Sequence, residues 1–452
     1  MKESMFNIIT ERKDGTVLLF NSMRKAFAIM DANNYNTFKA LKNVGYKADK
    51  SIPEAGSLLA QLEKSGFIIQ DDMNEIEYLK RRFEKSRASC GMFRLYIVPT
   101  SSCNFSCKYC YYAGNGNECM SEEVQDALPE FVKKRLAGKR ALNVIWTGGE
   151  PTLAPNIIER LSERLRRVAE EADVEYSSAI FTNGYLLDKN MANRFHACGI
   201  DIAQFVMDGP RHIHNERRPL VGGTETYDVI MKNLGDIAGI MDIAVRINFD
   251  STNADVQNIS SLLNSLKQCG LPRSTIIELA PVTAYTSQCG GYIGKYGLRK
   301  KEIAKKFSEL YPLVFESGFT PKFDMTPAVS ISPCTAGSCF GISKDGDIYR
   351  CFLLIGEERE CAGNIFMEDD VLARQKNNVK WDMWSPFSKE ECLKCNILPI
   401  CLGGCGCPLY DVAEDGYLRR DVRCMPLKFY IDDAMELNFR IQQKRRRDRN
   451  AV

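Results

Sequence analysis

The chain has 452 residues, of which 60 are basic and 58 acidic, and its net charge of +2 gives no global case for binding nucleic acid or a membrane surface. Its length exceeds one ordinary hydrophobic core, so about two to four domains are expected. The first residues lack the apolar core of a signal peptide, and no apolar run is long enough to cross a bilayer, so we expect a cytoplasmic location. In that reducing compartment the 18 cysteines are better candidates for metal ligands than for disulfides.

Residues 1–85 precede the first cysteine and read as a separate unit. Strand patterns around a turn-like Lys-Asp-Gly, and helical apolar spacing that ends at a glycine, predict short elements at 6–10, 16–20, 37–43, 57–66 and 67–70. A few strands and helices in so short a stretch predict a small winged-helix-like module. A charged helical linker is expected over 75–87.

Strand-like and helix-like segments alternate from residue 92 to about residue 320. Strands are expected at 93–98, 142–146, 178–181, 202–206, 243–247 and 276–279, with amphipathic stretches between them such as 121–136, 156–172 and 254–269. Strands that alternate with helices predict an α/β fold whose parallel sheet curls into a barrel or part of one. On such a fold the active residues belong at the carboxyl ends of the strands.

Three cysteines follow the first of these strands in C-x3-C-x2-C spacing, at Cys103, Cys107 and Cys110. Cysteine thiolates are the standard ligands of iron–sulfur clusters, so the loop is suited to three irons of one [4Fe–4S] cube. The fourth iron would then be open to a small molecule. Taken alone, the three thiols are equally compatible with half of a zinc site.

Polar motifs follow the other predicted strands, at Thr147-Gly-Gly-Glu150, Thr182-Asn-Gly184 and Met207-Asp-Gly209. Because the carboxyl ends of parallel strands meet at one edge of a sheet, we expect these motifs to face the cysteine loop.

The amino-acid composition changes after residue 333, where ten cysteines occur together with many glycines. One group is Cys334, Cys339 and Cys351, and a second has C-x2-C-x5-C-x3-C spacing followed by a distant cysteine, at Cys392, Cys395, Cys401, Cys405 and Cys424. The second group is also compatible with zinc. The chain closes with a helix expected from about residue 427, whose basic end reads as a solvated helix terminus rather than a nucleic-acid patch.

The cysteine loop, with Tyr109 before its third thiol and Gly-Gly-Glu-Pro at 148–151, resembles the radical SAM superfamily. The tail resembles the SPASM subgroup of that superfamily, with Gly346-x4-Cys351 followed by the second cysteine group. The pattern of a helix, then Gly-Phe-Ile-Ile at 66–69 and an acidic stretch, resembles the peptide-recognition domain of enzymes that modify ribosomally made peptides. A generic N-terminal extension is the alternative for this last feature.

The resemblance implies that S-adenosylmethionine chelates the fourth iron of the cluster. Gly148 and Gly149 would let the backbone approach the methionine ammonium, and Glu150 would accept a charge-assisted hydrogen bond from it. Tyr109 would flank the adenine. Further candidates for the ribose, the carboxylate or the cavity wall are Asn183, Asp208, Arg246 and Asn248, with ordinary turn or structural roles as the alternative. His212 and His214 are expected to be structural rather than acid–base residues.

By the same resemblance, the tail binds two auxiliary clusters and brings the total to three [4Fe–4S] clusters. Cys334, Cys351 and Cys405 would hold the first, with Cys339 as the candidate for a fourth ligand, and the pattern leaves open whether Cys339 closes that cluster. An open iron would be able to bind a substrate thiolate, whereas a closed cube only passes electrons. The second cluster would be held by Cys392, Cys395, Cys401 and Cys424.

The resulting expectation is a recognition domain over 1–85, a partial (β/α)6 barrel over 86–320, an auxiliary-cluster domain over 321–430 and a basic helix over 431–452. The function implied is a radical SAM maturase that abstracts hydrogen from a precursor peptide and forms a thioether or carbon–carbon crosslink. Its expected partners are the leader of that peptide and a reductant such as flavodoxin or ferredoxin.

Two alternatives stay open. One is formylglycine formation of the anaerobic sulfatase-maturase type, which commonly has an aspartate after the Gly-x4-Cys cysteine, where this chain has Phe352. The other is a zinc-binding peptide scaffold without catalysis.

Overall fold

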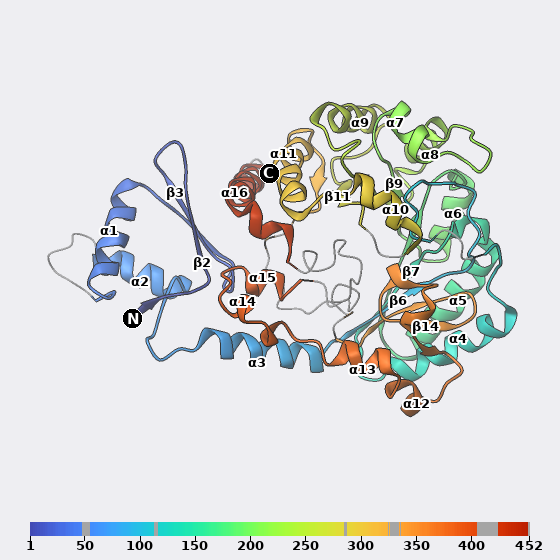
Figure 1. Cartoon of the computed structure of the whole chain (residues 1–452), viewed down its shortest axis with the longest axis horizontal. Coiled ribbons are helices and arrows are strands. Elements are labelled where there is room, and N and C mark those ends of the chain that lie inside the picture. The colour runs from blue at the N-terminus through green and yellow to red at the C-terminus, as the bar shows by residue number, and fades with distance from the viewer. Residues whose placement is uncertain are drawn as a thin grey trace.

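The computed structural model describes residues 1–47, 55–112, 116–283, 287–323, 325, 334, 336–404 and 424–450, and Figure 1 shows their arrangement. A small N-terminal module stands to one side of a large α/β body. Within these ranges no helix is long and apolar enough to cross a membrane.

The N-terminal module is built on a three-stranded antiparallel sheet of β2 (Asn7–Glu11), β3 (Val17–Asn21) and β4 (Ala26–Met30). Two helices pack on it, α1 (Ala32–Asn43) and α2 (Ala55–Ser65), and β1 (Lys2–Glu3) pairs with β5 (Ile68–Ile69). The linker is helical, as α3 (Glu75–Ala88). Strands β1 and β4 were not predicted, because β1 is only two residues long and the apolar run Ala-Phe-Ala-Ile-Met has no strand period.

Seven parallel strands form the body, and all six predicted ones are among them. They are β6 (Met92–Ile97), β7 (Ala141–Trp146), β8 (Glu175–Thr182), β9 (Ile202–Val206), β10 (Asp242–Phe249), β11 (Ile276–Pro281) and β12 (Thr320–Pro321). They follow one another in space in chain order and the sheet does not close, with β12 as its outermost strand. The predicted partial barrel is therefore confirmed.

Helices connect these strands and cover the sheet. They are α4 (Glu122–Arg135), α5 (Pro155–Glu171), α6 (Lys189–Ala197), α7 (Arg211–Arg217), α8 (Tyr227–Ile237), α9 (Val256–Gln268), α10 (Ser287–Tyr296) and α11 (Lys300–Glu316). Helix α5 shows why they form, because its Ile158, Leu161 and Leu165 recur at helical spacing and are fully buried. This packing holds the strand ends, and the loops on them, in place.

The C-terminal region continues the same sheet. β13 (Cys339–Ile342) pairs in parallel with β6, and β14 (Asp347–Tyr349) and β15 (Cys361–Asn364) follow in antiparallel order. Four short helices come next, at α12 (Asp369–Ala373), α13 (Lys376–Asp382), α14 (Glu390–Leu393) and α15 (Leu398–Cys401). The boundary expected after residue 320 stays a prediction, but the segment beyond it shares the backbone hydrogen bonds of the barrel.

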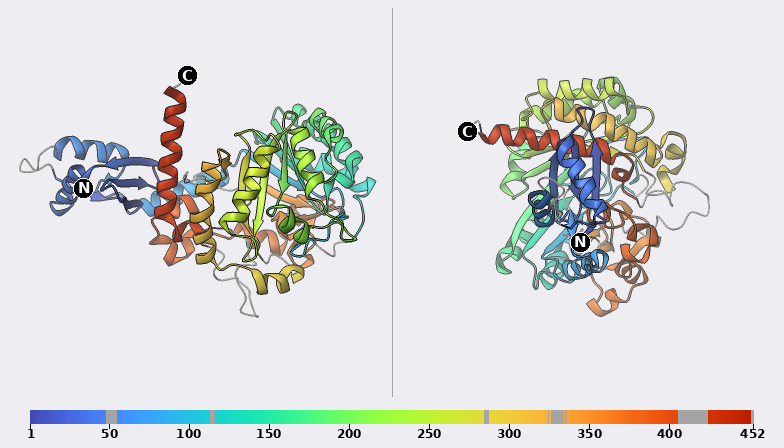
Figure 2. Two further views of the ribbon diagram at one scale, coloured as in Figure 1. Left: turned by 90° about the horizontal axis from the view of Figure 1, so that it is seen from above. Right: turned by 90° about the vertical axis from the view of Figure 1, so that its left-hand side faces the viewer.

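The closing helix, α16 (Ile431–Asn450), joins the N-terminal module to the body. On one side Arg12 donates from Nε to Glu436 Oε2 at 2.8 Å, and the rings of Phe27 and Phe439 stack at 6.3 Å. On the other side Arg440 donates to Glu316 of α11 at 2.8 Å. Figure 2 shows the helix standing between the two parts, so the predicted terminal helix is also a structural bridge.

Candidate active site

One cavity lies at the carboxyl ends of the parallel strands, and the cysteine loop lines it. Cys103, Cys107 and Cys110 reach it from the loop after β6, together with the Gly-Gly-Glu motif that follows β7. Tyr109, Asn183 and Arg246 line it as well. The structure therefore brings most of the residues predicted for the first cluster and its cofactor to one place, from strands that are far apart in the sequence.

Glycine is required at the contact between the two motifs. A Cβ atom on Gly149 would lie 2.2 Å from the carbonyl oxygen of Ser102 and 2.5 Å from that of Ser101. Gly148 has a φ of +129°, and its Cβ would lie 2.8 Å from the Thr100 carbonyl oxygen. The backbone N–H of Glu150 donates to Ser102 O at 2.8 Å. The strand end thus lies directly against the cysteine loop, with no room for a side chain.

Glu150 is 1% exposed and is held by four donors. Its Oε1 accepts from the Thr152 backbone N–H at 3.1 Å and from the hydroxyls of Thr152 and Thr182, each at 2.6 Å. Its Oε2 accepts from the Asn183 backbone N–H alone, at 2.6 Å. Burial raises the pKa of this carboxyl, although the hydrogen bonds oppose the shift. Oε2 of Glu150 can therefore accept a further hydrogen bond from a cation in the cavity.

Asn183 ties the end of β8 to the cysteine loop. Its side-chain amide donates to Asn104 Oδ1 at 2.8 Å, and its own Oδ1 accepts from the Tyr185 backbone N–H at 3.0 Å. The residue lines the cavity while its polar atoms hold the loop. A direct cofactor contact from Asn183 stays a prediction.

The three thiols and Arg218 form an electrostatic group. Burial raises the pKa of Cys107 to about 12 and that of Cys103 to about 11, and the Arg218 guanidinium opposes both shifts. Arg218 is 7% exposed, lines the cavity and donates from Nη1 to the Tyr109 hydroxyl at 2.9 Å. Its Nε has no hydrogen-bond partner among the described residues. Sequence reasoning missed Arg218, because no motif spacing distinguishes it from its neighbour.

This donor set fits a [4Fe–4S] cluster with S-adenosylmethionine. Three thiols are present for three irons, and the glycine backbone at the end of β7 lies beside them. The buried carboxylate of Glu150 is complementary to the ammonium of an amino acid, and the guanidinium of Arg218 is complementary to its carboxylate. Among the described side chains, no three His, Cys, Asp or Glu residues stand in the arrangement of a single-ion site.

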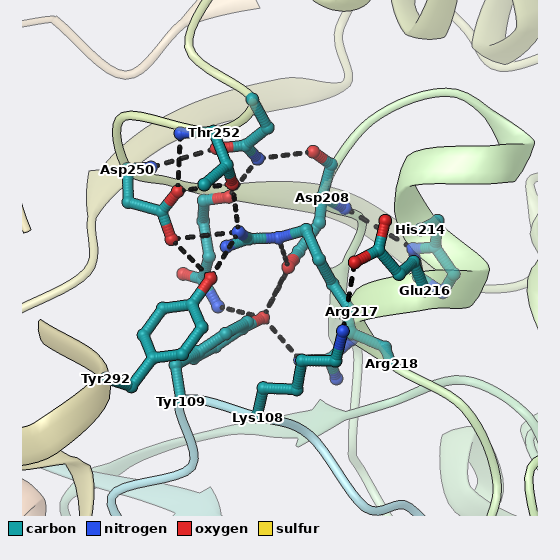
Figure 3. A network of polar contacts seen from close by, with 12 residues as sticks. Lys108, Tyr109, Asp208, His214, Glu216, Arg217, Arg218, Asp250, Thr252 and Tyr292 are labelled. Carbon is teal, nitrogen blue, oxygen red and sulfur yellow. Dashed lines mark hydrogen bonds and ion pairs between the residues drawn. The ribbon is translucent and has the colours of Figure 1, made fainter. Parts of the chain in front are cut away.

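Tyr109 and Asp208 belong to a buried polar network, shown in Figure 3. The Tyr109 hydroxyl lies 2.7 Å from Asp208 Oδ2, to which it donates. Arg217 donates from Nε to Asp208 Oδ2 and from Nη1 to Asp250 Oδ2, each at 2.8 Å, and from Nη1 to the Tyr292 hydroxyl at 2.9 Å. Asp208 is fully buried and is not among the residues that line the cavity, so the geometry favours a supporting role for it.

Arg246 is oriented by two neighbours on the inner face of the sheet. It donates from Nη1 to Glu278 Oε1 at 2.9 Å and from Nε to Asn248 Oδ1 at 3.0 Å. Asn248 in turn donates to the Tyr109 hydroxyl at 3.2 Å. Arg246 and Asn248 both line the cavity, and their contact with a cofactor stays a prediction.

His214 is fully buried behind Asp208, whereas His212 is exposed. The Asp208 backbone N–H donates to His214 Nδ1 at 3.3 Å, and burial together with Arg218 and Arg217 holds the His214 pKa well below its usual range. The ring is therefore neutral and structural, as expected from the sequence.

We expect this histidine to make stability depend on pH. Below about pH 6.5 the unfolded chain protonates His214 and the folded chain does not, so the unfolding free energy falls by up to about 1.4 kcal/mol per pH unit. Denaturant unfolding at about pH 7.5 and about pH 5.5 should show a smaller difference for His214→Asn than for the wild type. The exposed control, His212→Asn, should keep the wild-type difference, and equal pH slopes in both variants would contradict this account.

The described cysteines of the first auxiliary group lie at the junction of barrel and C-terminal region. The side chains of Cys334 and Cys339 are hydrogen-bonded to each other, and Cys339 is 1% exposed. Cys334, Cys339 and Cys351 surround Tyr96 of β6, in the same apolar cluster that Cys110 contacts. Cys405 lies outside the described residues.

The second auxiliary group is also gathered. Cys392 interacts electrostatically with Cys424 and Cys395, and Cys401 interacts with all three. Burial raises the pKa of Cys401 to about 11. Four thiols that are up to 32 residues apart in the chain (392 to 424) are thus neighbours, although their ligation of a cluster stays a prediction.

Phe352, which follows Cys351, lines the cavity. Its ring stacks on Tyr96 at 4.4 Å with an angle of 14° between the planes, and it meets Phe181 edge-on at 6.3 Å. An apolar wall therefore stands where the formylglycine-forming enzymes commonly have an aspartate.

Residues 97–248 match the model of the radical SAM superfamily. The cysteine-type anaerobic sulfatase-maturating enzyme of Clostridium perfringens is 26% identical over 364 residues, which are 75% of this chain and 95% of that enzyme. The radical SAM cyclopropyl synthase TigE of Paramaledivibacter caminithermalis is 21% identical over 439 residues, with 87% of each chain covered.

Two solved structures share the fold. Native anSMEcpe with bound AdoMet and Cp18Cys peptide aligns with a TM-score of 0.61 at 22% identity, and covers 78% of this chain and 99% of its own. Streptococcus suis SuiB bound to precursor peptide SuiA aligns with a TM-score of 0.53 at 15% identity, and covers 94% of this chain and 100% of its own. The second alignment thus extends over more of this chain.

Proposed function

We propose that this chain, an enzyme of the radical SAM superfamily, abstracts hydrogen from a ribosomally made precursor peptide and closes a thioether or carbon–carbon crosslink in it. The superfamily carries a [4Fe–4S] cluster and S-adenosylmethionine, and the cavity residues fit both. Because the chain is an enzyme, a zinc-binding scaffold without catalysis is set aside. Relatives of similar length and fold act on or bind peptides, which supports a peptide substrate.

A [4Fe–4S] cluster bound here would supply the one-electron reduction that turns S-adenosylmethionine into a hydrogen-abstracting reagent. The cysteine loop holds the cluster through Cys103, Cys107 and Cys110. Glu150 and Arg218 orient the amino-acid end of the cofactor, and the apolar wall around Phe352 keeps water away from the reacting carbon.

The observation that carries the choice of reaction is Phe352, which lines the cavity where formylglycine-forming enzymes commonly have an aspartate. Glu150 is the only Asp or Glu among the described residues that line the cavity, and four donors already hold it. Both reactions release a proton as well as a hydrogen atom, so it is the departure from the usual aspartate at Phe352 that disfavours formylglycine formation. In a crosslink one hydrogen atom would pass to the cofactor fragment, the second would leave as a proton to solvent, and the leftover electron would enter auxiliary clusters held by the C-terminal cysteines.

The second candidate is formylglycine formation, because four of the relatives by sequence are cysteine-type or serine-type anaerobic sulfatase-maturating enzymes. The solved structure of native anSMEcpe, however, covers 78% of this chain, whereas that of SuiB covers 94%. The extra N-terminal module supports the precursor-peptide proposal, in which that module grips the leader, for example as an added strand on its sheet edge. A reductant such as flavodoxin or ferredoxin supplies the electron.

Mass spectrometry separates the two candidates. The peptide encoded by a short cysteine-containing reading frame beside the gene is incubated anaerobically with enzyme, S-adenosylmethionine and dithionite, then treated with a hydrazide. We expect each crosslink to remove two hydrogens and to leave no group that the hydrazide traps. A hydrazide adduct would instead establish the aldehyde of formylglycine.

A further inference from the structure

A second, wider groove lies at the amino-terminal ends of β11 and β12, whereas the cysteine loop lies at the carboxyl ends of the strands. It has a volume of about 830 Å³ and is bounded by three parts of the chain. These are the N-terminal module through Phe20 and Lys25, the body through the ends of α11 and β12, and the helix α16. Figure 2 shows α16 standing between the module and the body.

The groove carries charge of one sign. Its described lining contains five cations, Lys25, Arg273, Lys322, Lys444 and Arg445, and no Asp or Glu. Aromatic rings lie among the cations, and Lys444 sits over the ring of Phe315 at 5.1 Å. In a chain whose overall charge is only +2, such a cluster concentrates a positive field in one concave surface. The surface therefore suits a ligand with carboxylates spaced between apolar side chains.

We propose that this groove docks an acidic, apolar-interspersed segment of the peptide substrate, an inference that rests on the proposed function. The position of the groove favours a peptide, because the groove borders the N-terminal module that we propose grips the leader. A segment held here lies between that module and the body.

The groove is also linked to the active-site cavity by an ion-pair chain. Lys322 of the groove contacts Glu278 Oε2 at 3.0 Å, and Arg246 of the cavity donates to Glu278 Oε1 at 2.9 Å. If a carboxylate of the bound peptide pairs with Lys322 in place of Glu278, the ion pair between Glu278 and Arg246 becomes stronger. For this reason the test leaves Lys322 unchanged and replaces groove cations that do not contact Glu278.

The test measures binding of a fluorescein-labelled peptide of alternating glutamate and leucine to the full-length enzyme by fluorescence anisotropy. The groove variant is the double change Arg273→Glu and Lys444→Glu, and the matched control is Lys134→Glu with Lys301→Glu, which has the same change in charge on exposed residues outside the groove. We expect the groove variant to bind about tenfold more weakly than the wild type, and the control to bind equally well. A milder pair, Arg273→Ala with Lys444→Ala, should fall between them, and the thermal unfolding midpoint checks that each variant is folded.

Equal affinity of the groove variant and the wild type would overturn the docking site. So would tighter binding of oligouridylate, or of phosphatidylserine vesicles, than of the acidic peptide. The proposed function is tested separately, because cleavage of S-adenosylmethionine without peptide should be the same in all variants. A precursor that stays unmodified while the acidic peptide still depends on the groove would sink the crosslinking reaction and leave the docking site standing.

Discussion

Replacement of Gly149 by alanine should reduce S-adenosylmethionine cleavage about a hundredfold, the cost of a displacement of about 1 Å in an active site. The added Cβ would stand 2.2 Å from the Ser102 carbonyl oxygen, and an ordinary contact begins near 3.4 Å. The Cβ is fixed by the backbone of residue 149 and would meet backbone carbonyl oxygens, so no side-chain rotation relieves the clash. The strand end and the cysteine loop must therefore move apart, which displaces the carboxylate next in sequence.

The measurement is the rate of 5′-deoxyadenosine formation with dithionite as reductant. Gly239→Ala is the matched control, because a Cβ there meets no atom within 4 Å and the position needs no left-handed φ. A Gly149→Ala enzyme with the wild-type rate would show that the close approach of the two motifs is not needed for cofactor binding.

Replacement of Cys107 by serine should have the largest effect, with cofactor cleavage falling to background. The thiol is buried beside Arg218 and Cys103, and the loop offers only three cysteines to the cavity. A serine hydroxyl is a poor iron ligand, so the cluster should be lost while the fold persists. Iron and sulfide content should fall by one cluster relative to the wild type.

The control for this prediction is Cys269→Ser, at the end of α9, where the thiol donates to the Leu266 carbonyl oxygen at 3.1 Å and does not line the cavity. It should keep the full iron content and rate. A Cys107→Ser enzyme that still forms 5′-deoxyadenosine would contradict the assignment of the loop to the radical-generating cluster.

The fold was predictable from the sequence in segments where the apolar residues follow one clear pattern, that of a strand or that of a helix. The six predicted strands of the barrel are mostly apolar runs separated by amphipathic helices, and all six formed at the expected places. The strands β13–β15 were missed because each has only three or four residues, in a region dominated by cysteine and glycine. The pairing of β13 with β6 is a long-range contact, across more than 240 residues, that no local pattern encodes.

The site was predictable to the extent that its residues lie in motifs. The cysteine loop and Gly-Gly-Glu came together because both follow parallel strands. Arg217 and Arg218 gave no signal, since a pair of arginines on a short helix usually reads as a solvated surface. Only the tertiary structure shows Arg217 bridging Asp208 and Asp250, and Arg218 facing the thiols.

The most direct test of the account is the fate of the abstracted hydrogen. The precursor peptide is prepared with deuterium on its carbon atoms and incubated with enzyme, unlabelled S-adenosylmethionine and dithionite. We expect deuterium in the 5′-deoxyadenosine, together with a peptide that has lost two hydrogen isotopes per crosslink. Unlabelled 5′-deoxyadenosine beside a peptide of unchanged mass, in an enzyme that cleaves the cofactor at full rate, would contradict the claim that this chain abstracts hydrogen from that peptide.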